Sequence, residues 1–238
     1  MEPANPINEL RTCRLLLRQW RASDLEPFAI LNADPEVMQY FPATLSREAS
    51  DGMAHRCEEL NEQRGWGFWA AEELATGEFV GFVGLHTRAA ELPCSPCVEV
   101  GWRLLKSHWG KGLATEGAAA SLSFAFETLN LTELVSFTSI NNHRSEAVMQ
   151  RLKMKRDAAT FAHPSLPHDH WLSEHCLYRL SAPRQPSKWC LVKAPECRSV
   201  PAFRSSGLSP AATVSGSSRA LRPSHPLIVA PLYSDPGR

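Results

Sequence analysis

The chain has 238 residues, enough for one sizeable domain with an appendage, because single domains usually run to ~100–200 residues. Basic and acidic residues each total 25, so neither a nucleic-acid partner nor charge-driven disorder is indicated. No apolar run approaches the ~18–20 residues that cross a bilayer, and the N-terminal sequence MEPANPINELRT lacks the features of a secretory signal. We therefore expect a cytoplasmic protein without a membrane partner.

The seven cysteines are an odd number without regular spacing, which fits reduced thiols better than a disulfide framework. Cys94 and Cys97 form a CxxC motif, but zinc would need two more ligands and no second CxxC or HxxxH supplies them. We therefore predict no metal site. The pair is interpreted as loop thiols before a strand, and a metal or redox role is the alternative.

The first part of the chain predicts a strand and two helices. Residues 10–20 (LRTCRLLLRQW) alternate between apolar and polar side chains, as a half-buried strand does. Ser23 or Asp24 can then act as the N-cap of a short helix that ends at Asp34-Pro35. A second helix is predicted from about Ser46 to Gln63, where apolar and small residues recur at helical spacing.

A β-hairpin is predicted next, because two apolar runs in GWGFWAAEELATGEFVGFVGLH flank the turn residues 75–78. Residues 98–105 read as a buried strand, rich in β-branched, aromatic and aliphatic side chains. An alanine-rich helix is predicted from about Leu113 to Asn130. The strand and the helix are thus separated only by a short glycine-containing turn.

The last predicted elements are a strand over 134–138, a helix capped by Ser145 and a closing strand over 175–180. Together the elements form a mixed α/β (α+β) domain over residues 7–182, in the order β-α-α-β-β-β-α-β-α-β with room for one more short strand.

Residues 183–238 differ in composition from the rest of the chain. They are dense in Pro, Ser and Arg, lack periodicity and contain the low-complexity run SSGLSPAATVSGSSRALRPSHP, so we predict a disordered tail. It could be regulatory, but the absence of a motif favours a read-through or frameshifted terminus. Its sparse arginines are not patterned for nucleic acid, which we do not expect as a partner.

The segment EVGWRLLKSHWGKGLAT, residues 99–115, has the order strand, glycine turn, helix. This order presents free N–H groups at the positive end of a helix dipole, and such a terminus binds phosphate. Gly110 and Gly112 would let the backbone approach a pyrophosphate closely. The dinucleotide and Walker fingerprints are absent, and an isolated GxG is more often a packing turn, so the context decides.

That context comes from several segments in a fixed order over roughly residues 8–181. They are LRTCRLLLRQW, GEFVGFVGL, VEVGWRL, WGKGLATE, NNHRSEAVMQRLKM and HPSLPHDHWLSEHCLYRL. Together they resemble the GNAT acyltransferases, and within them the branch typified by the ribosomal-protein alanine acetyltransferases RimJ and RimL. The resemblance implies a central mixed, mostly antiparallel twisted sheet with helices on both faces and a splayed strand at the acetyl-CoA site. We expect a monomer or a homodimer.

The resemblance also assigns the parts of the acetyl-CoA site. The family's loop pattern Gln/Arg-x-x-Gly-x-Gly/Ala starts here at Trp109, and tryptophan at that position is usual in the RimJ/RimL branch. The backbone N–H groups expected to hold the pyrophosphate belong to Gly110, Lys111, Gly112, Leu113, Ala114 and Thr115. The pantetheine arm is expected along the strand at Trp102, Arg103 and Leu104. Asn142 would bind the pantetheine amides, although it could simply be a loop-forming asparagine.

The implied reaction is direct transfer of the acetyl group to a primary amine, either a protein N-terminus or a small molecule. A base must take a proton from the amine and an acid should meet the departing thiolate. The resemblance makes Glu99 the candidate base, acting through a water, and a strand-end carboxylate paired with an arginine is an equal alternative. Ser145 is the candidate acid, and can be a helix cap at the same time. A non-catalytic acyl-CoA-binding or sensing domain is the alternative function.

Overall fold

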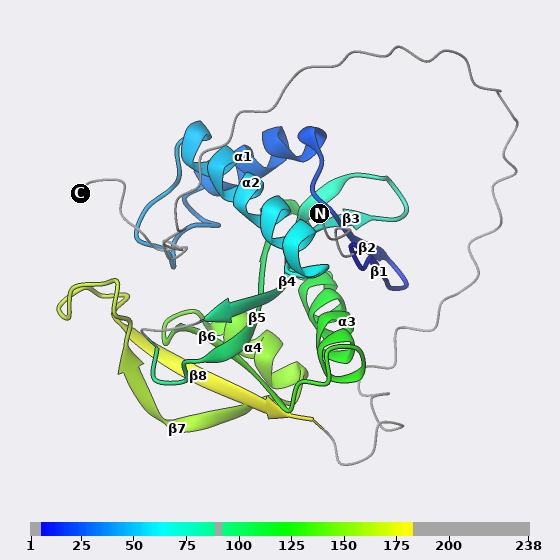
Figure 1. Ribbon diagram of the computed structural model, residues 1–238. Coiled ribbons are helices and arrows are strands. Elements are labelled where there is room, and N and C mark those ends of the chain that lie inside the picture. Colours follow the sequence, from blue (N-terminus) through cyan, green and yellow to red (C-terminus); the bar gives the residue numbers. More distant parts are fainter. Residues whose placement is uncertain (1–5, 89–91, 183–238) are drawn as a thin grey trace, which may run out of the picture.

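The computed structural model describes residues 6–88 and 92–182, which contain one eight-stranded sheet (Figure 1). The sheet has the strand order β1-β2-β3-β4-β5-β6-β8-β7. The strands are β1 (Leu10–Arg11), β2 (Leu15–Arg18), β3 (Phe68–Glu73), β4 (Phe79–Arg88), β5 (Cys97–Leu104), β6 (Glu133–Ser139), β7 (Lys155–Ala162) and β8 (Glu174–Ser181). The helices are α1 (Leu25–Ala33), α2 (Arg47–Arg64), α3 (Leu113–Glu127) and α4 (His143–Arg151), with short 3-10 turns η1 (Ala22–Asp24) and η2 (Lys106–His108). The predicted tail, residues 183–238, lies outside the described residues.

The sheet is antiparallel except where β5 meets β6. These two strands run parallel and pair through a single residue pair, Glu99 opposite Val135. Beyond that pair, β5 continues to Leu104 without a β6 partner, which leaves one edge of β5 open. The predicted mixed α/β architecture with a mostly antiparallel sheet is thereby confirmed.

Two hydrophobic cores lie on opposite faces of the sheet, and the alternation of β3 distributes side chains between them. Trp69 and Ala71 belong to the core beneath α3 and α4. Phe68 and Ala70 face the other way, into the core beneath α1 and α2. Figure 1 shows α1 and α2, the two helices of the second core, lying together. None of the helices in the described part of the chain is long and apolar enough to cross a membrane.

Most of the locally encoded elements appear as predicted. Helix α2 begins after Ser46, whose hydroxyl accepts a hydrogen bond from the Ala49 N–H at 3.2 Å. The hairpin turn over 75–78 joins β3 to β4. Helix α3 ends at Glu127, a few residues before the predicted end.

One strand prediction needs correction, and the prediction leaves one strand open. The single strand predicted over residues 10–20 is instead the two short strands β1 and β2, because the Thr12 hydroxyl and the Arg14 N–H turn outward to bind Glu116 of α3. Strand β7 is a further strand at the sheet edge, and much of it is exposed on both faces. Because neither face of β7 is buried, its sequence lacks the apolar alternation by which a strand is recognised.

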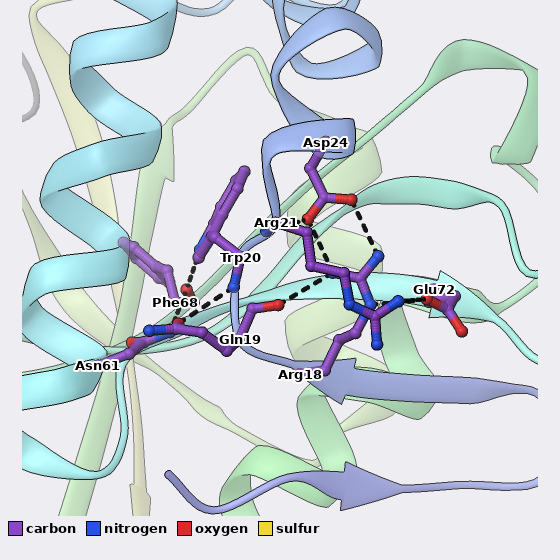
Figure 2. Close-up of polar contacts among 8 residues, drawn as sticks. All are labelled: Arg18, Gln19, Trp20, Arg21, Asp24, Asn61, Phe68 and Glu72. Carbon is purple, nitrogen blue, oxygen red and sulfur yellow. Dashed lines mark hydrogen bonds and ion pairs between the residues drawn. The ribbon is translucent and has the colours of Figure 1, made fainter. Parts of the chain in front are cut away.

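A buried ion-pair network joins β2 to its surroundings (Figure 2). Arg18 is 2% exposed, and its Nη1 and Nη2 donate to the two carboxylate oxygens of Asp24 at 2.7 and 2.9 Å. Its Nε donates to Glu72 Oε2 on β3 at 2.6 Å. Every charge in the network therefore has an opposite partner, as burial requires.

The same region saturates the carbonyl of Phe68 at the start of β3 (Figure 2). This oxygen accepts from the indole Nε1 of Trp20 at 2.8 Å and from Nδ2 of Asn61 on α2 at 3.2 Å. Because one carbonyl holds both Trp20, which follows β2, and the last turn of α2, it ties the N-terminal helices to the sheet.

We predict that Asp24→Ala lowers the free energy of unfolding by about 3–5 kcal/mol, because it leaves the Arg18 guanidinium buried without its bidentate partner. Urea denaturation followed by circular dichroism measures the change. Asp51→Ala is the matched control, because its partner Arg47 is 46% exposed at the side chain, so the loss should be much smaller. Equal losses for the two variants would show that the buried network is not a special source of stability.

Candidate functional site

A cavity of about 990 Å³ opens where β5 and β6 separate. Its walls come from β5, the glycine turn, the start of α3, β6, α4 and the loop after α1. Every residue predicted from the sequence for the site lines it: Glu99, Trp102, Arg103, Leu104, Gly110, Lys111, Gly112, Leu113, Ala114, Thr115, Asn142 and Ser145. The gap in the sheet therefore brings together segments that are far apart in the sequence.

The glycine turn has a backbone that favours glycine. Gly110 and Gly112 have φ angles of 73° and 80°, in the left-handed region where a side chain is strained. Gly112 is the N-cap of α3 and offers no side chain to its first N–H groups. These donors have no side-chain cap, and they belong to residues that line the cavity at the positive end of the helix dipole.

The turn is held in place by Arg14, from the connection between β1 and β2. Its Nη1 donates to the Lys111 carbonyl at 2.9 Å, and its Nη2 lies 2.6 Å from Glu116 Oε2. The Thr12 hydroxyl donates to the other Glu116 oxygen at 2.6 Å. The carboxylate in the first turn of α3 is thus occupied within the protein and does not oppose an anion at the helix terminus.

Trp109 connects the end of β5 to α4. Its indole Nε1 donates to the Leu104 carbonyl at 2.9 Å, which fixes the ring at the point where β5 ends. The guanidinium of Arg144, on α4, lies 4.5 Å from the Trp109 ring centroid, a cation–π contact. Tryptophan at this loop position therefore has a structural role that a glutamine or arginine could not fill in the same way.

The side chain of Arg103 turns away from the glycine turn, toward the α1–α2 side of the sheet. Its Nη1 donates to Asn32 Oδ1 at 2.6 Å, and its guanidinium lies 3.9 Å from the ring centroid of Phe41. Phe41 and Tyr40 belong to the loop after α1 and line the cavity. Arg103 therefore positions that loop, a contribution that the sequence did not indicate.

Glu99 lies at the point where β5 and β6 part. It is 6% exposed, and its Oε1 accepts from Arg88 Nη2 on β4 at 2.8 Å. Burial raises the pKa of Glu99, while the charge and hydrogen bond of Arg88 oppose that rise. The arginine pairing considered as the alternative is present, and the same carboxylate also lines the cavity. Its role as a base stays a prediction.

Ser145 is not the N-cap of α4, contrary to the prediction. Asn142 is the cap: its Oδ1 accepts from the Ser145 N–H at 3.2 Å. The Asn142 amide also donates to Thr138 Oγ1 at 3.0 Å and to Ser145 Oγ at 3.1 Å. Because both amide hydrogens are used within the chain, Asn142 is better suited to orienting Ser145 than to binding a pantetheine amide.

The Ser145 hydroxyl consequently has a defined direction. Its oxygen accepts from Asn142, which leaves its own hydrogen to donate elsewhere, and the residue lines the cavity.

In the described residues no group of three His, Cys, Asp or Glu side chains could hold a metal ion.

Sequence reasoning missed several residues of the cavity. They are contributed by the loop after α1, the end of β4, β6 and α4: Glu36, Tyr40, Phe41, Arg88, Phe137, Thr138 and Arg144. The pairing of β4 with β5 could have indicated Arg88, because its register places Arg88 opposite Cys97, two residues before Glu99 along β5. The loop after α1 carries no comparable signal.

Residues 14–155 match the family model described as acetyltransferase (GNAT) domain. The YkkB protein of Bacillus subtilis is 27% identical over 151 residues, 63% of this chain and 87% of that protein. YoaA of the same organism, named an N-acetyltransferase, is 25% identical over 150 residues, 62% of this chain and 83% of that protein. An Aspergillus fumigatus protein named FsC-acetyl coenzyme A-N(2)-transacetylase is 39% identical over 89 residues, 36% of this chain and 37% of that protein.

The solved structures agree on the fold. The acetyltransferase from Agrobacterium tumefaciens superposes with a TM-score of 0.60 at 29% identity, covering 76% of this chain and 99% of that chain. RimL in complex with coenzyme A has a TM-score of 0.57 at 17% identity, covering 73% and 98%, which supports the fold alone. Membership of the RimJ/RimL branch therefore stays a prediction. Because the family model spans more than half of the chain, this protein belongs to the GNAT family and is an acetyltransferase.

Proposed function

We propose that the protein transfers the acetyl group of acetyl-CoA directly to a primary amine inside the cavity between β5 and β6. The observation that carries this proposal is the grouping of three features around one cavity: the glycine turn, the buried carboxylate of Glu99 and the hydroxyl of Ser145. Holding both substrates together would supply a large share of the rate, because it turns a bimolecular step into an intramolecular one.

Acetyl-CoA would lie along the open edge of β5. Its pyrophosphate would accept hydrogen bonds from the N–H groups of Gly110 through Thr115, at the positive end of α3. Its pantetheine arm would extend past Leu104, Arg103 and Trp102, taking the place of the missing partner strand. This arrangement directs the thioester toward Glu99, where the two strands meet.

In the reaction, the amine nitrogen attacks the thioester carbonyl, the carbon–sulfur bond breaks and the sulfur leaves as a thiolate. Glu99 would accept the amine's proton through a water, and its raised pKa makes it a stronger base than an exposed carboxylate. Arg88 favours the ionised carboxylate and so opposes part of the rise that burial causes in its pKa. The Ser145 hydroxyl would protonate the thiolate and recover its proton from solvent.

The acceptor is a protein N-terminus or a small-molecule amine. The names of two similar proteins support nitrogen as the acceptor atom: RimL is described as an alpha-N-protein acetyltransferase, and the Aspergillus relative as an N(2)-transacetylase.

The test is release of free CoA from acetyl-CoA in the presence of a panel of primary amines and N-terminal peptides. We expect turnover with at least one acceptor class. Glu99→Gln should lower kcat by about 100-fold or more, because it removes the base while keeping the shape of the side chain. Calorimetry should find its affinity for acetyl-CoA nearly unchanged.

Glu133→Gln is the matched control, because Glu133 pairs with Arg179 from β8 and does not line the cavity. Its kcat should equal that of the unaltered protein. Equal turnover by Glu99→Gln would remove Glu99 from the mechanism. A folded sample that does not bind acetyl-CoA at millimolar concentration would overturn the proposed function.

The pH dependence of kcat gives a second prediction. Glu99 acts as a base only when ionised, so kcat should rise with pH through its pKa. Arg88 lowers that pKa, and Arg88→Met should therefore move the acid limb to higher pH. Arg64→Met is the control, because Arg64 bonds Thr87 outside the cavity and should leave the limb in place. If the acid limb of the Arg88→Met profile does not move, Glu99 is not the group whose ionisation controls kcat.

Two glycines allow a third prediction, because they have the same backbone conformation and only one of them lines the cavity. Gly110 and Gly77 have φ angles of 73° and 72°, and a Cβ at either would meet no atom within 4 Å. Alanine at each position should cost about 1–2 kcal/mol in strain. Only Gly110→Ala should also weaken acetyl-CoA binding, by about tenfold if the loop relaxes and must be restored on binding. Equal affinities would show that the turn does not bind the cofactor.

A further inference from the structure

The two thiols of the CxxC motif, Cys94 and Cys97, have no role in the proposed acetyl transfer. Cys94 lies in the loop before β5 and Cys97 is the first residue of that strand. Their sulfur atoms are 3.0 Å apart, and both residues are partly exposed. Two thiols at this separation, open to small reagents, form a pair that can be joined without rearranging the fold.

The two thiols differ in character. A hydrogen bond from Cys97 to the Cys94 sulfur lowers the pKa of Cys94 to about 7, and the same contact raises that of Cys97. Burial raises the pKa of Cys57 to about 12 and also raises that of Cys176. Since the thiolate is the nucleophile, Cys94 should attack first and Cys97 second.

The pair is connected to Glu99 through the sheet. The register of β4 and β5 places Arg88 directly opposite Cys97. Glu99 follows two residues later, so its side chain points to the same face of β5 as that of Cys97. The ion pair between Arg88 and Glu99 therefore involves the first residues of β5, the same part of the strand that contains Cys97.

We propose that Cys94 and Cys97 form a redox-active dithiol that reacts with low-molecular-weight disulfides and thereby alters acetyl transfer at Glu99. The exchange chemistry stands on the thiol pair alone. The coupling to acetyl transfer rests on the proposed function.

The exchange takes place in two steps. The Cys94 thiolate attacks one sulfur of the small disulfide, forming a mixed disulfide and releasing one small thiolate. The Cys97 thiol then loses its proton and attacks the Cys94 sulfur, which closes the Cys94–Cys97 disulfide and releases the second small thiolate. The protein loses two thiol hydrogens, and the reagent is reduced to two thiols that take up these protons.

Closing the disulfide draws the start of β5 toward the preceding loop. The change should reach the Arg88–Glu99 pair, which lies next to it, and should spare the glycine turn beyond the far end of β5. We therefore expect oxidation to lower kcat and to leave the KM for acetyl-CoA unchanged.

The experiment treats the full chain with glutathione buffers of graded ratio and then digests it with trypsin. Cleavage after Arg88 and Arg103 yields one peptide that holds Cys94 and Cys97 and no other cysteine. In oxidising buffer this peptide should lose two hydrogens, and excess reduced glutathione should restore it. Cys97→Ser should hold a glutathione adduct on Cys94, whereas Cys94→Ser should leave Cys97 largely unmodified. Cys176→Ser is the control and should react as the unaltered chain does.

Iodoacetamide labelling of the unaltered protein gives a measure that needs no variant, since Cys94 should be alkylated before Cys97. A peptide that stays reduced at every ratio would overturn the exchange, and so would equal modification of the two single variants. An oxidised protein with the same kcat as the reduced protein would overturn the coupling. If neither form transfers acetyl groups, the proposed function is wrong, and the coupling is wrong with it. The exchange is then tested by the oxidation state of the peptide alone.

Discussion

The site depends on a single interruption in the sheet. Strands β5 and β6 are parallel and pair only at Glu99 and Val135, after which they separate. Helix α3 connects them, and its N-terminus therefore lies at the far end of the gap, next to the glycine turn. A continuous β5–β6 ladder would bury the edge of β5 and close the cavity. The cavity that we propose for acetyl-CoA therefore exists because of how the strands pair, and that pairing also positions the side chains that line it.

The rest of the fold keeps the gap stable. Two cores on opposite faces of the sheet hold the strands on either side, so the cavity does not need to be filled for the domain to be compact. Charges are buried only with partners: Arg18 between Asp24 and Glu72, and Glu99 with Arg88. The second pair does more than satisfy a charge, because Arg88 opposes the rise that burial causes in the pKa of Glu99, a residue that lines the cavity.

The fold and most of the candidate site could be predicted from short-range patterns and from the family resemblance. Helix α2 and its Ser46 cap, the β3–β4 hairpin and the glycine turn all follow from spacing along the chain. The two failures have different physical origins. Residues 10–20 form two strands because Glu116, about a hundred residues away in sequence, binds the connection between them. Ser145 is not the cap because α4 begins earlier, at His143, where the Asn142 side chain accepts a hydrogen bond from the Ser145 N–H.

The sequence alone determined which segments are helix or strand, where a backbone suited to phosphate occurs, and which family the chain resembles, since periodicity, capping and glycine act over a few residues. Tertiary structure decided which side chains meet. The pairing of Arg88 with Glu99, the contact of Arg144 with Trp109 and the approach of Cys94 to Cys97 depend on register and loop geometry. Such partners are chosen by the packing of the whole sheet, because electrostatic and hydrogen-bond energies depend on distances that no local pattern encodes.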